Sequence, residues 1–373
     1  MNTRYLLSLT LLLAGCAPRR SEPTPALGFA KLVDTLSEPG GYFDSDNLVS
    51  NETAYLHVLG GLQKLGVHGG TYIGVGPEQN FSYIAEIQPE LALIIDIRRD
   101  NMLLHLLFKA MFESSNTRIE YLSQLFGRRP PPDPQVWPAK DLSVHLSYLD
   151  DAGLDSVAHD SVHRALMSRI EEYGVPLSAE DRSTMRRFHD EFARNGLELT
   201  FATLGRPPQR DYPTVRRLYT ETDLEGNRRS YLASEERWRR VRDLQRQNRV
   251  IPLVGDMGGT VAMRAIGRYL KSTNRTVSAF YASNVEFYLM RNGTFDEWVE
   301  SMRLMPASGS SVLIRSHFDR GFRGPGMQPG HFSSQHLQTF ERFLEMVNEP
   351  VGRTYLDLVS DTAGARLVAP GAP

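Results

Sequence analysis

The residues best suited to chemistry stand where two expected strands end. Gly74 and Gly76 close the β-branched and aromatic run 71–75, where glycines let backbone N–H groups approach a ligand at the start of a helix. Asp96 follows Gly74 by 22 residues, near the end of the apolar run 91–97. In a βαβ unit this spacing brings a carboxylate to the neighbouring strand tip, where it can accept hydrogen bonds from ribose hydroxyls. The pair predicts a site for a nucleoside-type ligand. The alternative is a tight turn and a helix cap.

Polar residues that follow later strand-like runs would reach the same place, because ligands of open α/β sheets lie beyond the carboxyl ends of the strands. Asp256 and Asn284 are the candidate catalytic residues. Asp256 could orient a nucleophile or take a proton, and Asn284 could fix a polar substrate group. Ser283, Glu286 and Glu52 are the candidate substrate contacts. Helix capping is the alternative role at both strand ends.

The elements that must position these residues repeat the order strand, glycine turn, helix. Strands are expected at 71–75, 91–97, 250–254 and 276–282, and helices at 81–87, 101–113 and 261–270. This alternation predicts an α/β fold with a doubly wound, mostly parallel sheet. We also expect the strands after Gly70 and after Gln247 to lie side by side, so that Gly76 and Asp256 face one crevice.

The other segments flank this pattern. Amphipathic helices are expected at 27–36, 52–65 and 234–247, and further candidate strands at 197–203, 311–314 and 355–359. From about 118 to 195 the sequence is polar and rich in charge, which predicts a helical insertion. A single α/β domain would then span 27–373.

The N-terminus resembles a bacterial lipoprotein signal peptide. Arg4 precedes a leucine-rich apolar run, too short to span a bilayer, that ends in Leu-Ala-Gly-Cys at Cys16. We therefore expect residues 1–15 to be removed, Cys16 to be lipidated and 16–26 to be a tether. The protein would be anchored to a membrane of the bacterial cell envelope, facing the periplasm or the exterior. An ordinary secretory signal is the alternative. Cys16 is the only cysteine, so an internal disulfide is excluded.

Residues 69–101 resemble the class I S-adenosylmethionine-dependent methyltransferases. Gly74 to Gly76 stand at the first motif and Asp96 at the ribose-binding acid. More of the chain is similar to a bacterial lipoprotein family of uncharacterised function with a methyltransferase-like domain. The similar segments are 41–52, 73–80, 95–101, 252–256 and 281–286. The resemblance implies a Rossmann-like domain and S-adenosylmethionine as cofactor. The third motif glycine is missing, since Glu78 and Gln79 stand at its usual places, and we keep Gln79 as a cofactor-binding candidate.

Charge and histidines indicate little else. The net charge of -2 gives no general attraction for phosphates, so we expect no nucleic-acid partner. His159 and His163 share a helix face but lack the H-E-x-x-H pattern, and we interpret them as part of a solvated surface. His317, His331 and His336 lie in or beside a Gly/Pro-rich loop that could bind a carboxylate or phosphate, although a plain surface loop is the simpler interpretation. We assign no metal site.

Two functions remain open. The first is an exported, membrane-anchored lipoprotein whose methyltransferase-like domain binds a nucleoside-type molecule and transfers a group. The second is a non-catalytic binding or interaction lipoprotein that keeps only the fold. Export favours a changed ligand, because S-adenosylmethionine is made and used in the cytoplasm. No G-x-S-x-G elbow or P-loop occurs in the sequence.

Overall fold

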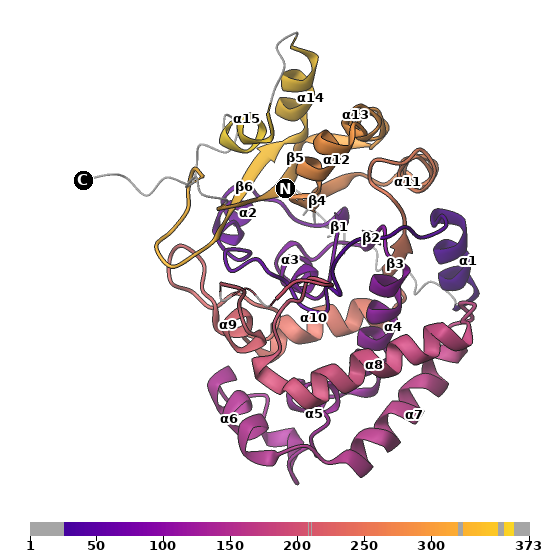
Figure 1. Cartoon of the computed structure of the whole chain (residues 1–373), viewed down its shortest axis with the longest axis vertical. Helices are drawn as coiled ribbons and strands as arrows, with labels where there is room; N and C mark the ends of the chain where they lie inside the picture. The colour runs from indigo at the N-terminus through magenta and orange to yellow at the C-terminus, as the bar shows by residue number, and fades with distance from the viewer. Residues whose placement is uncertain (1–25, 208, 210, 320–323, 350–353, 362–373) are drawn as a thin grey trace, which may run out of the picture.

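The computed structural model describes residues 26–207, 209, 211–319, 324–349 and 354–361 (Figure 1). The expected signal peptide, the lipidated Cys16 and the tether up to residue 25 lie outside the described residues. Within these ranges, no helix combines the length and the apolar character needed to cross a membrane.

The described residues form an α/β fold around one mostly parallel sheet. Its strands are β1 Thr71–Gly74, β2 Leu91–Asp96, β3 Val250–Val254, β4 Val277–Ser283, β5 Ala307–Phe318 and β6 Ser333–Thr339. Their order is β3-β2-β1-β4-β5-β6, and every neighbouring pair is parallel except β5 and β6. The chain moves outward from β1 to β3, returns to the other side of β1, and moves outward again to β6. This doubly wound order is consistent with a Rossmann-like sheet and confirms the expected fold class.

The expected adjacency of the strands after Gly70 and after Gln247 is wrong. β2 lies between β1 and β3, because Ala92 of β2 pairs with Val250 while Leu91 pairs with Thr71. Each crossover in this half of the sheet moves the chain one place further from β1. All three strands are parallel, so their carboxyl ends still meet at one edge of the sheet.

Helices cover both faces of the sheet, as Figure 1 shows. One face carries α3 Gln79–Ile87, α4 Arg99–Ser114 and α10 Glu235–Arg246; the other carries α1 Ala26–Leu36, α11 Ala262–Ser272, α13 Phe295–Arg303 and α14 Phe340–Asn348. The short helices α2 Leu59–Lys64, α9 Val215–Thr220, α12 Val285–Asn292 and α15 Tyr355–Ser360 lie at the sheet's ends and edges. Every residue of β1, β2 and β3 is buried, which explains their continuous apolar runs.

The segment expected as a helical insertion contains helices throughout. They are α5 Arg118–Leu125, α6 Leu142–Ala152, α7 Ser156–Glu172 and α8 Ala179–Asn195, with a 3-10 turn at Pro134–Val136. α7 and α8 pack on α4, and together these helices form the lower end of the molecule in Figure 1. Thr117 and Glu120 form a capping box at the start of α5, which fixes where the segment begins.

Three expected elements differ from the structure. Residues 53–58 form turns, and only Leu59–Lys64 is helical, because residues 52–62 are almost all buried and present no solvated face. Residues 197–203 form no strand; Gly196–Glu198 is a 3-10 turn, followed only by isolated bridges. Residues 355–359 lie in α15, whose start is fixed by a capping box. Short apolar runs of this kind fit both the helical and the strand periodicity, so the sequence pattern does not separate the two.

The prediction that His159 and His163 of α7 belong to a solvated surface is also wrong. His159 and His163 are buried, with 5% and 7% of their surfaces exposed, because α7 packs against α8. His159 Nε2 lies 2.8 Å from Asp190, and His163 Nδ1 lies 3.1 Å from Nδ1 of His189. These contacts assign the pair to a helix–helix interface.

Candidate functional site

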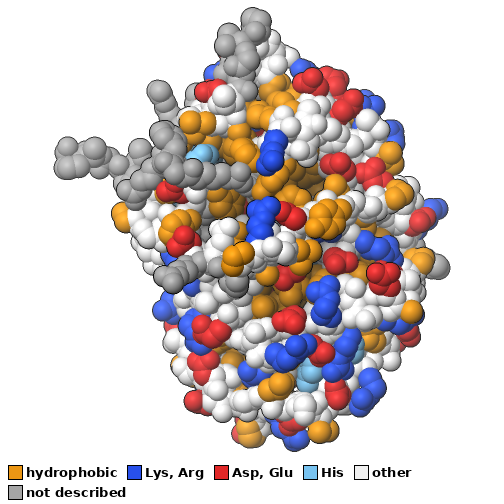
Figure 2. Space-filling model, in the orientation of Figure 1, with side chains coloured by type: hydrophobic (Ala, Val, Ile, Leu, Met, Phe, Trp, Pro, Cys, Tyr) orange, Lys and Arg blue, Asp and Glu red, His pale blue; other side chains and the backbone are white. Residues whose placement is uncertain are grey.

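A cavity of about 700 Å³ lies at the carboxyl ends of β1 to β4, where the strand order reverses. This is the place where open α/β sheets bind ligands, and the volume is within the range of small-molecule sites. Figure 2 shows hydrophobic side chains gathered in a hollow at the middle of the face seen in Figure 1. The candidate residues that line the cavity are Glu52, Gly76, Gln79, Asp96, Asp256, Ser283 and Asn284. Gly76 and Asp256 thus share one crevice, as expected.

Two of the sequence candidates do not line it. The role of Gly74 is spatial, because a Cβ there would lie 2.0 Å from Oδ1 of Asn80. Glu286 is fully buried, accepts a 2.8 Å hydrogen bond from the indole of Trp298, and forms an ion pair with Arg315. Both residues therefore serve the packing around the cavity.

The loop between β1 and α3 is held in place by buried side chains. Asn80 Nδ2 lies within 3.1 Å of the carbonyl oxygens of residues 75, 76 and 77. Gly76 adopts φ +81°, a conformation that favours glycine, and its carbonyl accepts a 2.9 Å hydrogen bond from His105 Nε2. Burial lowers the pKa of His105 to about 4, so the ring is neutral and donates from Nε2. These hydrogen bonds fix the conformation of the loop.

A buried acid lies behind this loop. Glu78 is 3% exposed and accepts hydrogen bonds from the hydroxyls of Tyr219 (2.8 Å) and Tyr231 (3.0 Å). Its other carboxylate oxygen has no hydrogen-bond partner among the described residues. Burial raises the pKa of Glu78 to about 7, against the opposing effect of the two hydroxyls.

Asp96 is held by the next arginine along the chain. Its Oδ1 accepts from the Arg98 backbone N–H (2.9 Å) and Nε (3.2 Å), and its Oδ2 accepts from Nη2 (3.2 Å). Arg98 also donates to the carbonyl oxygens of Ser45 and Asp46, at 3.1 and 2.8 Å. Asp96 therefore fixes the 45–46 segment over the cavity. A carboxylate has about four acceptor sites, so one remains on Oδ2 for a ligand.

The polar centre of the site is Glu52, which is only 1% exposed. It accepts hydrogen bonds from Tyr281 (2.7 Å), Ser283 and Gln335. Burial is the largest effect on the Glu52 pKa and raises it, whereas these hydrogen bonds oppose the rise. No Lys or Arg forms an ion pair with it in the described part of the chain. The sequence indicated Glu52 as a candidate substrate contact, and its partners come from strands distant in the sequence.

Ser283, the last residue of β4, has an unusual backbone conformation, and Asn284 follows it. Ser283 has φ +51°, which costs a residue with a Cβ about 1–2 kcal/mol. The turn aims the Ser283 hydroxyl at Glu52. Asn284 precedes α12, but its side chain makes no capping hydrogen bond. The helix-cap alternative therefore does not account for Asn284, whose amide lines the cavity.

Asp256 and Gln79 differ in how many of their hydrogen-bonding atoms have a partner within the protein. Asp256 Oδ1 accepts a 2.8 Å hydrogen bond from the Gly258 N–H, which closes a local turn. The Asp256 N–H donates to the Glu38 carboxylate at 2.7 Å. Gln79 Nε2 donates to the Tyr281 hydroxyl at 3.3 Å, while Gln79 Oε1 is buried without a hydrogen-bond partner. Buried polar atoms are rarely left unpaired, so Gln79 Oε1 is a ready acceptor for a ligand group.

Aromatic side chains complete the walls. The rings of Phe43 and Tyr288 meet edge to face at 5.2 Å, and those of Phe201 and Tyr212 at 5.0 Å. Sequence reasoning missed these four. Tyr288 stands four residues after Asn284 on α12, and this spacing places both on one helix face. The other three lie outside regular elements, where no periodic signal exists.

The sequence matches one family model over residues 48–129 and 183–365, described as a domain of unknown function, DUF7790. The chain belongs to the DUF7790 family. No curated protein matches the sequence. The DUF7790 stretches contain all the candidate residues that line the cavity, and they leave out α6 and α7.

Proposed function

We propose that this DUF7790 protein binds a nucleoside-type small molecule in the cavity, with Glu52 as its acid–base group. One observation carries the proposal. Where the strand order of the sheet reverses, the rigid glycine loop after β1 lies beside two hydrogen-bond acceptors that have room for a further donor. These acceptors are Gln79 Oε1 and the remaining site on Asp96 Oδ2. Ribose hydroxyls can donate hydrogen bonds to such acceptors, and the aromatic walls offer faces and edges for a base.

The residues also fit the nucleoside part of S-adenosylmethionine, the cofactor that the methyltransferase resemblance implies. When bound, it would supply an activated methyl group. Glu52 would then accept the proton that a substrate hydroxyl or amine loses, because burial raises its pKa and it already accepts a hydrogen bond from the Ser283 hydroxyl. Asn284, whose Oδ1 accepts a 3.5 Å hydrogen bond from Ser283 Oγ, would orient the acceptor substrate through its side-chain amide, and Asp256 would face the same substrate from beyond the end of β3.

The second candidate function is non-catalytic binding by an envelope lipoprotein. The sequence observation that favours it is the lipobox-like end at Cys16, which would anchor the protein outside the cytoplasm, away from the supply of S-adenosylmethionine. The cavity would then hold a related ligand without group transfer. Mass spectrometry of small molecules retained by the purified protein would identify that ligand directly.

Calorimetric titration with S-adenosylmethionine, S-adenosylhomocysteine and adenosine tests the proposal. We expect saturable binding of at least one of them. Asn284→Ala should weaken the binding of ligands that contact this amide by about tenfold to a hundredfold. The ligand group would lose its hydrogen-bond partner, and an unpaired buried polar group costs about 1–3 kcal/mol. The Asn284 side chain supports no helix cap, so folding should be unchanged. The matched control is Asn195→Ala, at the exposed end of α8.

Asp96→Ala should weaken binding by a similar factor, but it also leaves the buried Arg98 guanidinium without its carboxylate. Its thermal stability must therefore be measured beside its affinity. Group transfer would be tested with Glu52→Gln, which should retain ligand binding and lose turnover. Absence of binding to all three compounds at millimolar concentration, with the protein folded, would refute the nucleoside proposal.

A further inference from the structure

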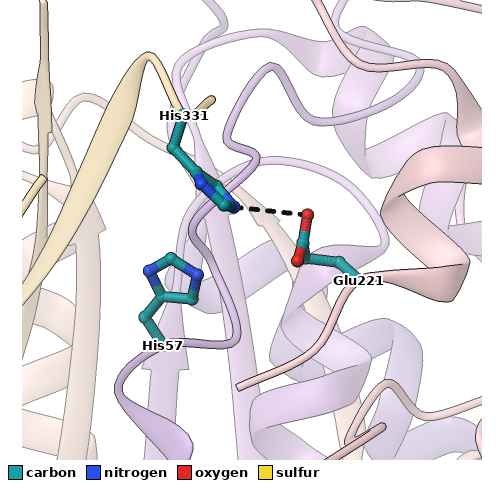
Figure 3. A group of neighbouring side chains, drawn as sticks. All are labelled: His57, Glu221 and His331. Atoms are coloured by element: carbon teal, nitrogen blue, oxygen red, sulfur yellow. Dashed lines mark ion pairs between the residues drawn. The ribbon is translucent and has the colours of Figure 1, made fainter. Parts of the chain in front are cut away.

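Outside the cavity, two histidines and a glutamate from distant parts of the sequence point at one another. His57 lies just before α2, Glu221 follows α9, and His331 precedes β6. Their ligand atoms all lie within 4.8 Å of one another, and Figure 3 shows the three side chains converging. His331 Nε2 is 3.4 Å from a Glu221 oxygen, and the two imidazole rings are 4.7 Å apart. None of the three lines the cavity described above.

A polar atom of this cluster is not satisfied by the protein. His331 Nε2 is buried and has no hydrogen-bond partner among the described residues. His57 is 7% exposed, and its ring meets the His331 ring edge to face. Buried imidazoles normally find a partner, so the arrangement indicates a missing one.

The three segments are tied together in pairs around the cluster. The Ala54 N–H donates to Ser333 Oγ (3.4 Å), which joins the His57 and His331 segments. The Tyr55 hydroxyl donates to the Leu218 carbonyl (2.9 Å), and Arg217 donates to the Gly330 carbonyl (2.6 Å). Each pair of ligand-bearing segments therefore has its own hydrogen bond. This support preorganises the side chains, as outer contacts do in metal sites.

We propose that His57, Glu221 and His331 form a binding site for a divalent transition-metal ion. Two imidazoles and one carboxylate are the donor set that zinc and non-haem iron sites use. Calcium and magnesium prefer oxygen ligands alone, so they do not fit. With metal–ligand bonds of about 2.1 Å, ligand atoms of a tetrahedral ion lie roughly 3.4 Å apart. Small side-chain rotations would bring the ligand atoms from their present separations, up to 4.8 Å, to those that a bound ion requires.

The charges around the site are compatible with one divalent ion. Glu221 provides one negative charge, and Asp223 contributes a second nearby, although Arg229 is paired with it at 2.6 Å. Arg217 Nε lies 3.9 Å from the Glu221 carboxylate, and the Arg217 Nη2 group donates to the Gly330 carbonyl. Three protein ligands leave at least one coordination position open, as in catalytic rather than structural zinc sites.

The test uses the purified full chain, stripped with a chelator and titrated with Zn²⁺ by calorimetry, with Co²⁺ as a spectroscopic probe. We expect one equivalent to bind wild type and to raise its melting temperature. His331→Ala should weaken binding by at least about a hundredfold, since loss of a mere outer-shell partner already costs about 10- to 100-fold. Glu221→Gln should weaken binding and change the Co²⁺ spectrum.

His68→Ala is the matched control, because this exposed histidine lies outside the cluster and should leave the affinity unchanged. Melting of the metal-free variants shows that they are folded. His163→Gln tests the other histidine cluster. The proposal is overturned if folded wild type binds no Zn²⁺, if His331→Ala binds as wild type does, or if His163→Gln removes the bound equivalent instead.

Discussion

Replacing Glu78 with glutamine should remove a pH-dependent destabilisation of the fold. Glu78 is buried and has no Lys or Arg ion-pair partner among the described residues, and burial raises its pKa from 4.5 to about 7. A carboxyl group with a raised pKa binds its proton more tightly in the folded state. Stability is therefore greatest where Glu78 is protonated, falls as the pH rises above about 4.5, and levels off above about pH 7.

The magnitude follows from the pKa. One pKa unit corresponds to about 1.4 kcal/mol, so ionisation of Glu78 costs the folded state about 3 kcal/mol at pH 8. Glutamine has the shape of the neutral acid, and its oxygen can accept from both tyrosine hydroxyls. Glu78→Gln should match wild type at acidic pH and exceed its free energy of unfolding by about 3 kcal/mol at pH 8.

Urea unfolding, followed by circular dichroism from pH 5 to pH 8, measures this difference. Titration of other groups cancels, because wild type and variant share them. The control is Glu341→Gln, at the exposed start of α14, which should show a constant difference across the range. If the Glu78→Gln difference also stays constant with pH, the carboxyl does not carry the raised pKa, and the reasoning fails.

Three further predictions concern the roles of Gly74, Glu286 and Cys16. Gly74→Ala places a Cβ 2.0 Å from a side-chain oxygen and should destabilise the fold by about 1–3 kcal/mol, whereas Gly309→Ala, in open space, should have little effect in the same thermal melts. Glu286→Gln leaves the buried Arg315 uncompensated and should cost about 3–5 kcal/mol in urea unfolding; an unchanged stability would return Glu286 to the substrate candidates. Cys16→Ser should abolish metabolic labelling with fatty acid, and recovery of the intact wild-type N-terminus from the cytoplasm would contradict the lipoprotein prediction.

Local patterns predicted the strands that carry the site. Apolar runs identified β1, β2, β3 and β4, with a glycine turn after β1 and β3, because strands buried on both faces are continuous in sequence. β6 was missed, since its residues Ser-Ser-Gln-His-Leu-Gln-Thr carry almost no apolar signal. It pairs with β5 through backbone hydrogen bonds, which a side-chain pattern does not show.

The candidate site was predictable in position but not in its connections. Asp96 and Asp256 stand where strand ends place them, so their presence in one cavity follows from topology. The hydrogen bonds of Glu52 to Tyr281 and Gln335 join residues more than two hundred positions apart, and nothing local encodes them. The His57 cluster was missed for the same reason, because its three members come from three separate segments.

The long excursion between β2 and β3 has a consequence for how the chain folds. Thr71 and Leu91 pair across a short connection of about 20 residues, whereas Ala92 and Val250 pair across roughly 160. Loop closure then costs about 2 kcal/mol more for β3 than for β2, before any contact offsets it. We expect β1 and β2 to associate first, and β3 to join only after the helices between them have packed and shortened the effective loop. The cavity wall carrying Asp256 would therefore be the last part of this half of the sheet to form.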